Sequence, residues 1–519
     1  DMFHSLSSQI DDILADPKGG ISPILHDFFG AAQDVADDPS SSSARSQMIN
    51  TANSLVNRFQ TFNTRFDELS RNVNDGIRDS ITEVNTIVSA IQEVNDALVR
   101  LNVGGEGSSQ SADLLDRRDA LLNALSQKID INVVNEQNSN ITVLVGNGQT
   151  LLNGNRAFQL ATQQDPSDPS REIIVYQGLN TFSDISSQLT GGEIGGMLDY
   201  RNNVLNPTRN SLGRVALVLA ETFNQQHNNG MDLNGAPGGD FFSVNGPTVT
   251  ASSANSPGPS ATAQITDLSQ LTTNDYELSY NGTTWAVTST DGRTSGPPVA
   301  GTISFDGLDF NIAGGAPATG DSFTIRPTFS GARSLDVVVS DPNAIAAAAP
   351  IRTLSSDANL GDVTISPGVV TGPVDPTVLL TPVTLTFVAS ATPPVPPSTV
   401  PDTVLISNSA VTVGATTYAA GIEIPYTKGM QINYNGWQAT LTGNPEVGDL
   451  FTVRSNAGGV GDNRNMLSLA QLQTTSIFDN NTANYQEAYS IIVGSVGSLT
   501  SSSEIDRDAN EALLTQYVD

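Results

Sequence analysis

The sequence predicts a multi-domain protein of the α plus β class. Both ends of the chain are expected to form an elongated helical-bundle rod domain, into which β-rich outer domains are inserted. Three observations lead to this prediction. No proline occurs between Pro39 and Pro166, and apolar residues recur there every three or four positions, as on one face of a helix. From Pro342 to Pro445 the chain carries 13 of its 27 prolines, which excludes long helices there. Helical spacing returns after Gly461.

Composition narrows the classes of function. The 519 residues include no cysteine and three histidines, and their formal net charge is -31. Without cysteine the chain cannot form disulfides, thiolate metal sites or a cysteine nucleophile. The acidic balance argues against nucleic acid and anionic membranes as partners, because both are negatively charged. No apolar run reaches the roughly 18 residues of a membrane span, and residues 1–4 lack the pattern of a signal peptide.

The longest predicted element is a helix over Arg45–Leu101, whose apolar positions form one stripe. At about 1.5 Å per residue it would extend over roughly 85 Å, more than the width of an ordinary domain. Such a stripe serves either as the bundle's own core or as a contact between copies in an assembly, and the sequence leaves both roles open. The candidate assembly or bundle-packing stripe in this helix is Leu55, Phe59, Phe62, Phe66, Leu69, Val73, Ile77, Ile81, Val84, Val88 and Ile91.

The glycine-rich segment 104–107 predicts the end of this helix, and a second helix is expected from about Ser111. Beyond it, apolar and polar residues alternate, which predicts a small β region over 131–184 with a turn at 138–140. Helical spacing resumes after Gly195-Gly196, with a proline at a kink or in a first turn.

Three residues near the ends of this third helix have expected roles. Pro207 marks the kink or first turn near its beginning. We expect His227 to cap or pack at the helix end, where a histidine complements the negative end of the helix dipole. Gly230 suits the left-handed conformation of a C-terminal cap.

Between Phe241 and Asn456 the chain is β-like and contains an internal repeat. In each copy an Asx-Gly turn, at 306–307 and at 435–436, leads through a loop to a Gly-Asp-x-Phe-Thr strand. We therefore expect two β modules, joined near Asp341–Pro350.

Two tryptophans accompany Asn-Gly turns in these modules. Trp285 follows the turn at 281–282, and Trp437 follows the turn at 435–436. We expect both in a repeated core role, since exposed aromatic platforms for sugar are the less common use of such residues.

The C-terminal section predicts helices that join those of the N-terminal region. Folding both ends together into one bundle would leave the β modules as a projecting arm. The second part of the candidate assembly or bundle-packing stripe is Tyr485, Tyr489, Ile492, Val496 and Leu499.

Catalytic and ligand-binding signatures are not found in the sequence. The glycines at 191–196 do not match a dinucleotide loop, and the segment 232–235 lacks the spacing of a calcium loop, so an Asx-turn loop is expected there. Asp165 and Asp168 are interpreted as solvated turns and caps. We expect no catalytic residue, no cofactor and no metal site.

These observations divide the chain into six expected segments. They are the N-terminal part of the helical rod domain (1–130), a small β region (131–190), the middle part of the rod domain (191–236), a β domain (237–345), a second, variable β domain (346–458) and the C-terminal part of the rod domain (459–519).

Several segments taken in order resemble the FlgK family of flagellar hook-associated proteins at the hook–filament junction. Each is weak alone, but together they are specific. They are Asp38-Pro39 with Arg45, Leu114–Leu122, Gly192–Arg201, Phe223–Gly235 with Phe241-Phe242, and Gly461–Asn465.

The resemblance implies a structural adaptor that joins hook to filament without catalysis. Its implied partners are the hook protein, the adjacent hook-associated protein, copies of itself, and the flagellar export machinery with a chaperone. Its implied location is extracellular, on the flagellum, after export by the flagellar type III pathway. The non-methionine start then indicates a core fragment lacking both terminal segments.

The sequence leaves two alternative classes of function. One is a secreted carbohydrate-binding or carbohydrate-cleaving protein with β-sandwich modules, because paired carboxylates and tryptophans are available. The other is a flagellar tip or hook component. The tip-cap family lacks segments similar to 116–119 and 462–465, which disfavours it.

Overall fold

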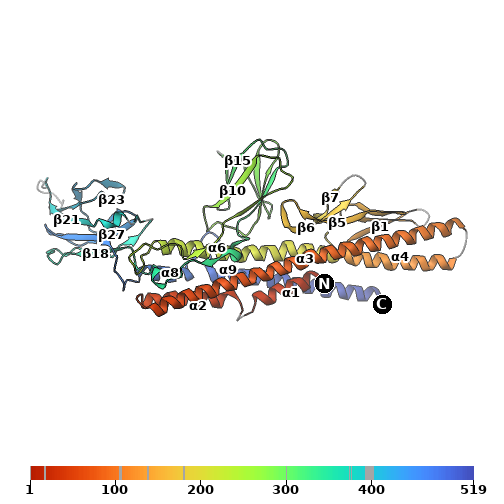
Figure 1. The fold of residues 1–519 in the computed structure, drawn as a ribbon, viewed down its shortest axis with the longest axis horizontal. Helices are drawn as coiled ribbons and strands as arrows, with labels where there is room; N and C mark the ends of the chain where they lie inside the picture. The colour runs from red at the N-terminus through yellow and green to blue at the C-terminus, as the bar shows by residue number, and fades with distance from the viewer. Residues whose placement is uncertain are drawn as a thin grey trace.

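The computed structural model describes residues 2–16, 19–104, 108–136, 140–178, 182–299, 301–372, 374–375, 377–391 and 403–518. Long helices lie lengthwise in a bundle, and the sheets project from one side and from one end of it (Figure 1). The predicted combination of helices and antiparallel sheets is confirmed. Most of the helix break expected at 104–107, and most of the turn expected at 138–140, lie outside the described residues.

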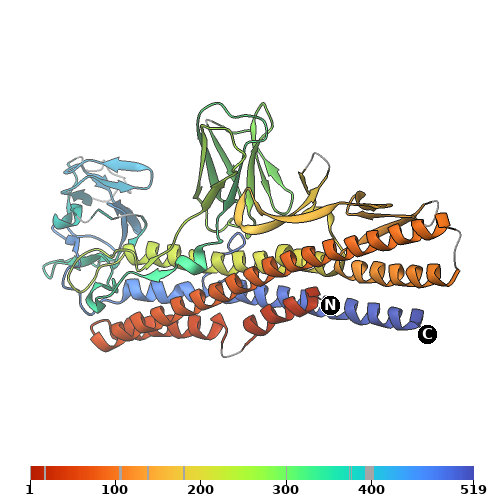
Figure 2. The ribbon, with the colours of Figure 1, turned by 45° about the vertical axis from the view of Figure 1, so that its right-hand side comes forward.

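The first half of the bundle contains α1 (Met2–Leu14), α2 (Ile21–Asp37), α3 (Ser42–Gly104) and α4 (Ser108–Lys128). Helix α2 ends where Asp38 precedes Pro39, because a residue before proline avoids the α conformation. Helix α3 continues for 63 residues without proline, and α4 returns along its distal part (Figure 2).

The middle of the chain adds α5 (Gly192–Tyr200), a π-helical turn η3 (Arg201–Leu205) and α6 (Asn206–Asn228). The prediction that helix resumes after Gly195-Gly196 is wrong, because α5 already contains both glycines. A Cβ on Gly195 would lie 2.5 Å from the carbonyl carbon of Thr190, which excludes a side chain. Pro207 lies in the first turn of α6, where its missing N–H is tolerated, and the wide turn directly precedes it.

Helices from the two ends of the chain lie side by side. After α8 (Arg464–Gln471), the long helix α9 (Tyr485–Val518) packs against α1 and α6, while α8 packs against α2 and α6. Both views show α9 running beside the N-terminal helices (Figures 1 and 2). One apolar core extends through these helices. None of the described helices is long and apolar enough to cross a membrane.

The small β region lies over α3 and consists of two sheets, β1-β2-β3-β4 and β5-β6-β7. Alternating apolar residues explain its packing, since Ile141, Val143 and Val145 are buried against the bundle core. Its strands are β1 (Ile131–Asn135), β2 (Ile141–Val145), β3 (Gln149–Asn153), β4 (Arg156–Ala157), β5 (Gln159–Asp165), β6 (Asp168–Gln177) and β7 (Phe182–Asp184).

The first β module, residues 248–326, pairs a five-stranded sheet with a three-stranded sheet. Short strands β8 (Phe242–Ser243) and β17 (Asp336–Val337) pair below it, beside the short helix α7 (Gly331–Ser334). Its strands are β9 (Thr248–Ala251), β10 (Pro259–Ile265), β11 (Tyr276–Tyr280), β12 (Trp285–Ser289), β13 (Thr294–Ser295), β14 (Thr302–Phe305), β15 (Leu308–Gly314) and β16 (Ser322–Arg326).

The second β module, residues 351–455, lies at the end of the bundle. It has its own apolar core between two sheets. Its strands are β18 (Ile351–Ser355), β19 (Thr364–Ile365), β20 (Val369–Val370), β21 (Val383–Ala389), β22 (Thr403–Ser407), β23 (Val411–Val413), β24 (Thr416–Tyr418), β25 (Ile424–Pro425), β26 (Met430–Tyr434), β27 (Trp437–Thr442) and β28 (Leu450–Ser455).

The two modules repeat one topology. The strand order β13-β12-β11-β16-β9 of the first corresponds to β25-β22-β21-β28-β18 of the second. In the other sheet of each module, the hairpin β14–β15 corresponds to β26–β27. Both hairpins close through two residues with positive φ, Asp306-Gly307 and Asn435-Gly436, as a type I′ turn requires.

The expected core role of the two tryptophans is confirmed, but they do not occupy equivalent positions of the repeat. Trp285 begins β12 and is 7% exposed, whereas Trp437 begins β27 and is 1% exposed. These strands occupy different positions in the repeated topology, because β12 corresponds to β22 and β27 to β15. Burial also removes both rings as platforms on which a sugar could stack.

Candidate functional site

The predicted stripe on α3 lies inside the chain's own core. All eleven of its residues are at most 3% exposed. They face α2 near the start of the helix, and α4, α5 and β5 farther along. In this conformation these side chains are covered by the chain itself, so a neighbouring subunit would meet the other faces of α3.

The predicted residues of α9 bind this helix to both halves of the bundle. Tyr485 is fully buried, and its hydroxyl lies 2.5 Å from the Thr222 hydroxyl of α6. The Tyr489 hydroxyl donates a 2.9 Å hydrogen bond to the Leu14 carbonyl of α1. Ile492 and Val496 are buried, and Leu499 is partly buried against the same core.

Beyond this anchored part, α9 exposes apolar side chains. Ile491, Ile505 and Leu513 are 57%, 66% and 53% exposed. The helical spacing of the C-terminal stripe continues to Leu513 in the sequence, but Ile491 and Ile505 were not expected, because they fall outside that stripe.

A set of polar side chains, which we call the clasp, surrounds the segment that leads into the second β module. The clasp consists of Arg45, His227, Arg464 and Asn465. Arg45 is 1% exposed, and its guanidinium donates to the carbonyls of Pro39 at 2.6 Å and Ile345 at 2.7 Å. These residues come from three segments that are distant in sequence.

The other members of the clasp form hydrogen bonds to the same segment. Asn465 donates to the Ala346 carbonyl at 2.6 Å and accepts from Gln226 at 2.7 Å. Arg464 donates to the Ile351 carbonyl at 2.5 Å and pairs with Asp462 at 2.8 Å. Three of the segments that carried the family resemblance therefore meet in space, which the sequence order alone could not reveal.

His227 is buried in the last turn of α6, so the expectation that it packs at the helix end is confirmed, and its tautomer is defined. The Ala346 N–H donates to His227 Nε2 at 2.9 Å, so the ring proton is on Nδ1, which donates to the Gly239 carbonyl at 2.6 Å. The imidazole is fully buried, and burial lowers its pKa below the ordinary value. The neutral ring links the end of α6 to two loops.

Gly230 has a different purpose from the predicted left-handed cap. It is not among the glycines with positive φ. A Cβ at this position would lie 2.6 Å from the Ala346 carbonyl oxygen and would also collide with the Asn465 amide. The glycine is needed because the clasp packs directly against the backbone.

The predicted loop at 232–235 is a turn stabilised by its own aspartate. Asp232 accepts a 2.8 Å hydrogen bond from the Ala236 N–H and one from the Asn234 amide, in agreement with the expected Asx-turn loop. Asp165 and Asp168, in contrast, were wrongly interpreted as solvated. They are largely buried, and they form ion pairs with Arg171 and Arg326 respectively.

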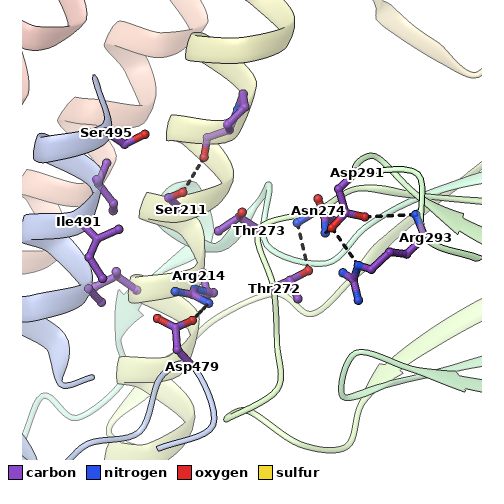
Figure 3. A pocket seen from close by; sticks show the side chains of 14 residues that line it. Ser211, Arg214, Thr272, Thr273, Asn274, Asp291, Arg293, Asp479, Ile491 and Ser495 are labelled. Carbon is purple, nitrogen blue, oxygen red and sulfur yellow. Dashed lines mark hydrogen bonds and ion pairs between the residues drawn. The ribbon is translucent and has the colours of Figure 1, made fainter. Parts of the chain in front are cut away.

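A cleft of about 460 Å³ lies between α6, α9 and the first β module (Figure 3). Its charged side chains are paired with each other, Arg214 with Asp479 at 2.9 Å and Arg293 with Asp291 at 2.9 Å. No histidine lines it. The cleft therefore offers apolar and hydrogen-bonding surface together with paired charges.

The described residues contain no group of three or more histidine, aspartate or glutamate side chains placed to hold a metal ion. The described residues form long helices with a covered core, and polar side chains connect them where the β modules join.

Two family models match most of the chain up to the second module. The model of the flagellar hook-associated protein FlgK helical domain matches residues 7–242. The model of a D2-like domain of flagellar hook-associated protein 1 matches residues 250–327. The chain belongs to the FlgK family.

Individual members of the FlgK family agree with this assignment. The chain is 33% identical over 355 residues to flagellar hook-associated protein 1 of Escherichia coli K12, covering 67% of this chain and 64% of that protein. The Salmonella typhimurium relative is 32% identical over 361 residues, covering 68% of this chain and 65% of that protein. The alignments thus span slightly less than two thirds of these relatives.

A solved FlgK structure covers the whole chain. The hook junction protein FlgK of Burkholderia pseudomallei matches with a TM-score of 0.87 and 28% identity, over 100% of this chain and 96% of that one. The FlgK fold therefore includes both β modules and the bundle.

Proposed function

We propose that the chain is a structural subunit of the bacterial flagellum that joins the hook to the filament, with no catalytic role. The observation that carries this proposal is the structural match to a FlgK hook junction protein over the whole chain. The buried tryptophans leave the carbohydrate alternative without its main support.

In this proposal the helices from both ends of the chain form a single rod, and the β domains project outward from it. The contacts of α9 with α1 and α6 support the rod. The proposed boundaries are 1–130, 191–236 and 459–519 for the rod, and 131–190, 237–345 and 346–458 for the β regions. The separate apolar cores of the second module and the bundle support the last boundary.

The proposed partners are hook protein, the adjacent hook-associated protein and further copies of this chain. The proposed location is outside the cell, on the flagellum, after export through the flagellar machinery with a chaperone. Because the α3 stripe is covered within the chain, we propose that lateral contacts between copies use the outer faces of α3 and α9.

Deletion of the gene in the source bacterium tests the main proposal. Electron microscopy should show hooks without filaments, and the intact gene supplied on a plasmid should restore them. Normal filaments on the deletion strain would overturn the proposed function.

The lateral contacts have a test of their own, because the chain has no cysteine. A single cysteine at exposed Ser54 of α3 or Ser498 of α9 should crosslink neighbouring copies in isolated flagella under oxidation. A cysteine at Thr417 of the second module, also exposed, is the control and should crosslink less. Equal crosslinking at all three positions would contradict the proposed packing.

A further inference from the structure

A small cavity lies where the bundle, the small β region and the first β module meet. Its charged lining consists of Arg171, Arg201, Arg209 and Arg326 together with Asp168 and Asp275. Four of the 23 basic residues of the chain thus face one cavity, whereas the chain as a whole carries a charge of -31. With all six groups ionised, the lining has two positive charges in excess.

Most of these arginines have a carboxylate partner. Arg171 pairs with Asp165, Arg209 with Asp67, and Arg326 with Asp168. The guanidiniums of Arg209 and Arg326 also lie over the ring of Phe329, each 4.8 Å from its centre. The cluster is therefore held in place by residues from all three parts of the molecule.

Arg201 differs, because it forms no ion pair within the described part of the chain. It is 3% exposed, and its Nη1 donates to the Glu172 carbonyl at 2.8 Å. The Nε atoms of Arg201, Arg209 and Arg326 are buried and have no acceptor among the described residues. Buried donors without hydrogen-bond partners are costly. The carboxylates of Asp165, Asp168 and Asp184 attract Arg201 electrostatically, but none of them forms an ion pair with it within the described residues, and a buried cation without a paired counter-ion is costly as well.

We propose that this cavity binds one small inorganic anion of halide size, which accepts hydrogen bonds from these Nε–H groups and neutralises Arg201. The cavity has room for about one water-sized species, which favours a monatomic anion over a larger one. Burial lowers the pKa of Arg201 to about 10 and also lowers that of Arg209. A bound anion would raise both pKa values again.

Asp275 opposes the anion and makes its binding depend on pH. The carboxylate accepts from Asn210 at 2.9 Å and lies 3.6 Å from Arg326 Nε. Burial raises its pKa to about 6, so acidification through this range removes one negative charge from the cavity. The other charged groups around it are Asp67, Asp165, Asp168 and the four arginines. Anion affinity should therefore rise as pH falls from 7 to 5.5.

Halide titration of the purified protein tests the site. At constant ionic strength, replacing sodium gluconate with sodium bromide should raise the melting temperature in a saturable way. Asp275→Asn should lower the half-saturating bromide concentration at pH 7 about tenfold, because one nearby negative charge is removed. It should also abolish the difference between pH 7 and 5.5.

Arg201→Met should abolish the bromide effect. Arg214→Met is the control, because Arg214 is another largely buried arginine whose Nε lacks an acceptor among the described residues. Unlike Arg201, it is paired with Asp479 and lines the separate cleft. If Arg201→Met does not fold, anomalous diffraction from bromide-soaked crystals of the unchanged protein shows whether the cavity binds the anion. A bromide peak in the cavity supports the proposal. Water alone there, or an equal bromide response in both arginine variants, overturns it.

Discussion

At the scale of single residues, the clasp shows why burial was easier to predict than partners. Spacing alone identified the buried positions of α3, since a helix repeats its faces every 3.6 residues. The partners of His227 could not be inferred in this way. Its Nε2 bonds to Ala346, which is 119 residues distant in the chain. Only the fold brings these two groups together.

The buried imidazole of His227 predicts a pH-dependent stability. The pKa of His227 is lowered in the folded chain and about 6.5 in the unfolded chain. Below pH 6.5 the unfolded state binds a proton at this imidazole, whereas the folded state does not. The free energy of unfolding therefore falls on acidification below pH 6.5, by at most about 1.4 kcal/mol per pH unit. His227→Gln should flatten the fall in unfolding free energy between pH 7.5 and 5.5, as measured by chemical denaturation.

The control for this prediction is His26→Gln. His26 is exposed and lies 3.1 Å from the Gln473 amide. Its substitution should leave the pH dependence of the unfolding free energy unchanged. Equal slopes in the His227→Gln variant and the unchanged protein would contradict the role assigned to the buried ring.

The close packing at Gly230 predicts a specific steric sensitivity. Gly230→Ala should destabilise the protein by about 1–3 kcal/mol, because the methyl group must displace the Asn465 amide and the Ala346 carbonyl. Gly239→Ala has no atom within 4 Å of its new methyl group and should be nearly neutral. Thermal unfolding of both variants provides the measurement, and equal melting temperatures would contradict the steric explanation.

At the scale of elements, the helices and the paired hairpins were predictable, whereas their ends were not. The long helix was expected over Arg45–Leu101, and α3 extends to Ser42–Gly104. The start of α5 was misplaced because glycine normally weakens a helix. Here Gly195 lies within the helix because the chain passes against Thr190. Such close approaches depend on tertiary packing and leave no periodic pattern in the sequence.

Helix α3 offers a direct test of the covered stripe. Phe66→Ala, which removes a fully buried ring, should lower the unfolding free energy of the bundle by about 3–5 kcal/mol. Thr64→Ala, on the exposed face of the same helix, should change it by less than about 0.5 kcal/mol. Denaturant unfolding followed by helical circular dichroism measures both. A small effect at Phe66 would mean that the stripe is not the bundle core.

At the scale of the whole molecule, the two β modules are attached in different ways. The repeat in the sequence predicted two modules, but it contained no information on how each one joins the bundle. The core of the first module includes Leu217 of α6. The core of the second consists of its own residues, and its entry and exit are adjacent, since the Asn456 N–H donates to the Pro350 carbonyl at 2.9 Å.

The second module should therefore be removable. Replacing residues 352–454 with a short glycine linker should eliminate one calorimetric unfolding transition and leave the bundle folded, with a similar melting temperature. Removing residues 248–326 in the same way should destabilise the bundle, because Leu217 becomes exposed. If removal of the second module also unfolded the bundle, the prediction that this module is structurally independent would be contradicted.

The π-helical turn at Arg201–Leu205 has a consequence for the register of the chain. An α-helix advances by about 100° per residue, so the additional residue in a wide turn rotates everything that follows it by that angle. Helix α5 packs against α1, α3 and α4, whereas α6 packs mainly against α7, α8 and α9 and also touches α3. The turn changes the helical register, so the apolar residues before it and those after it point toward different neighbouring helices. Deleting a single residue within it would turn one of these two faces away from its neighbours, although no side chain of either face had been changed.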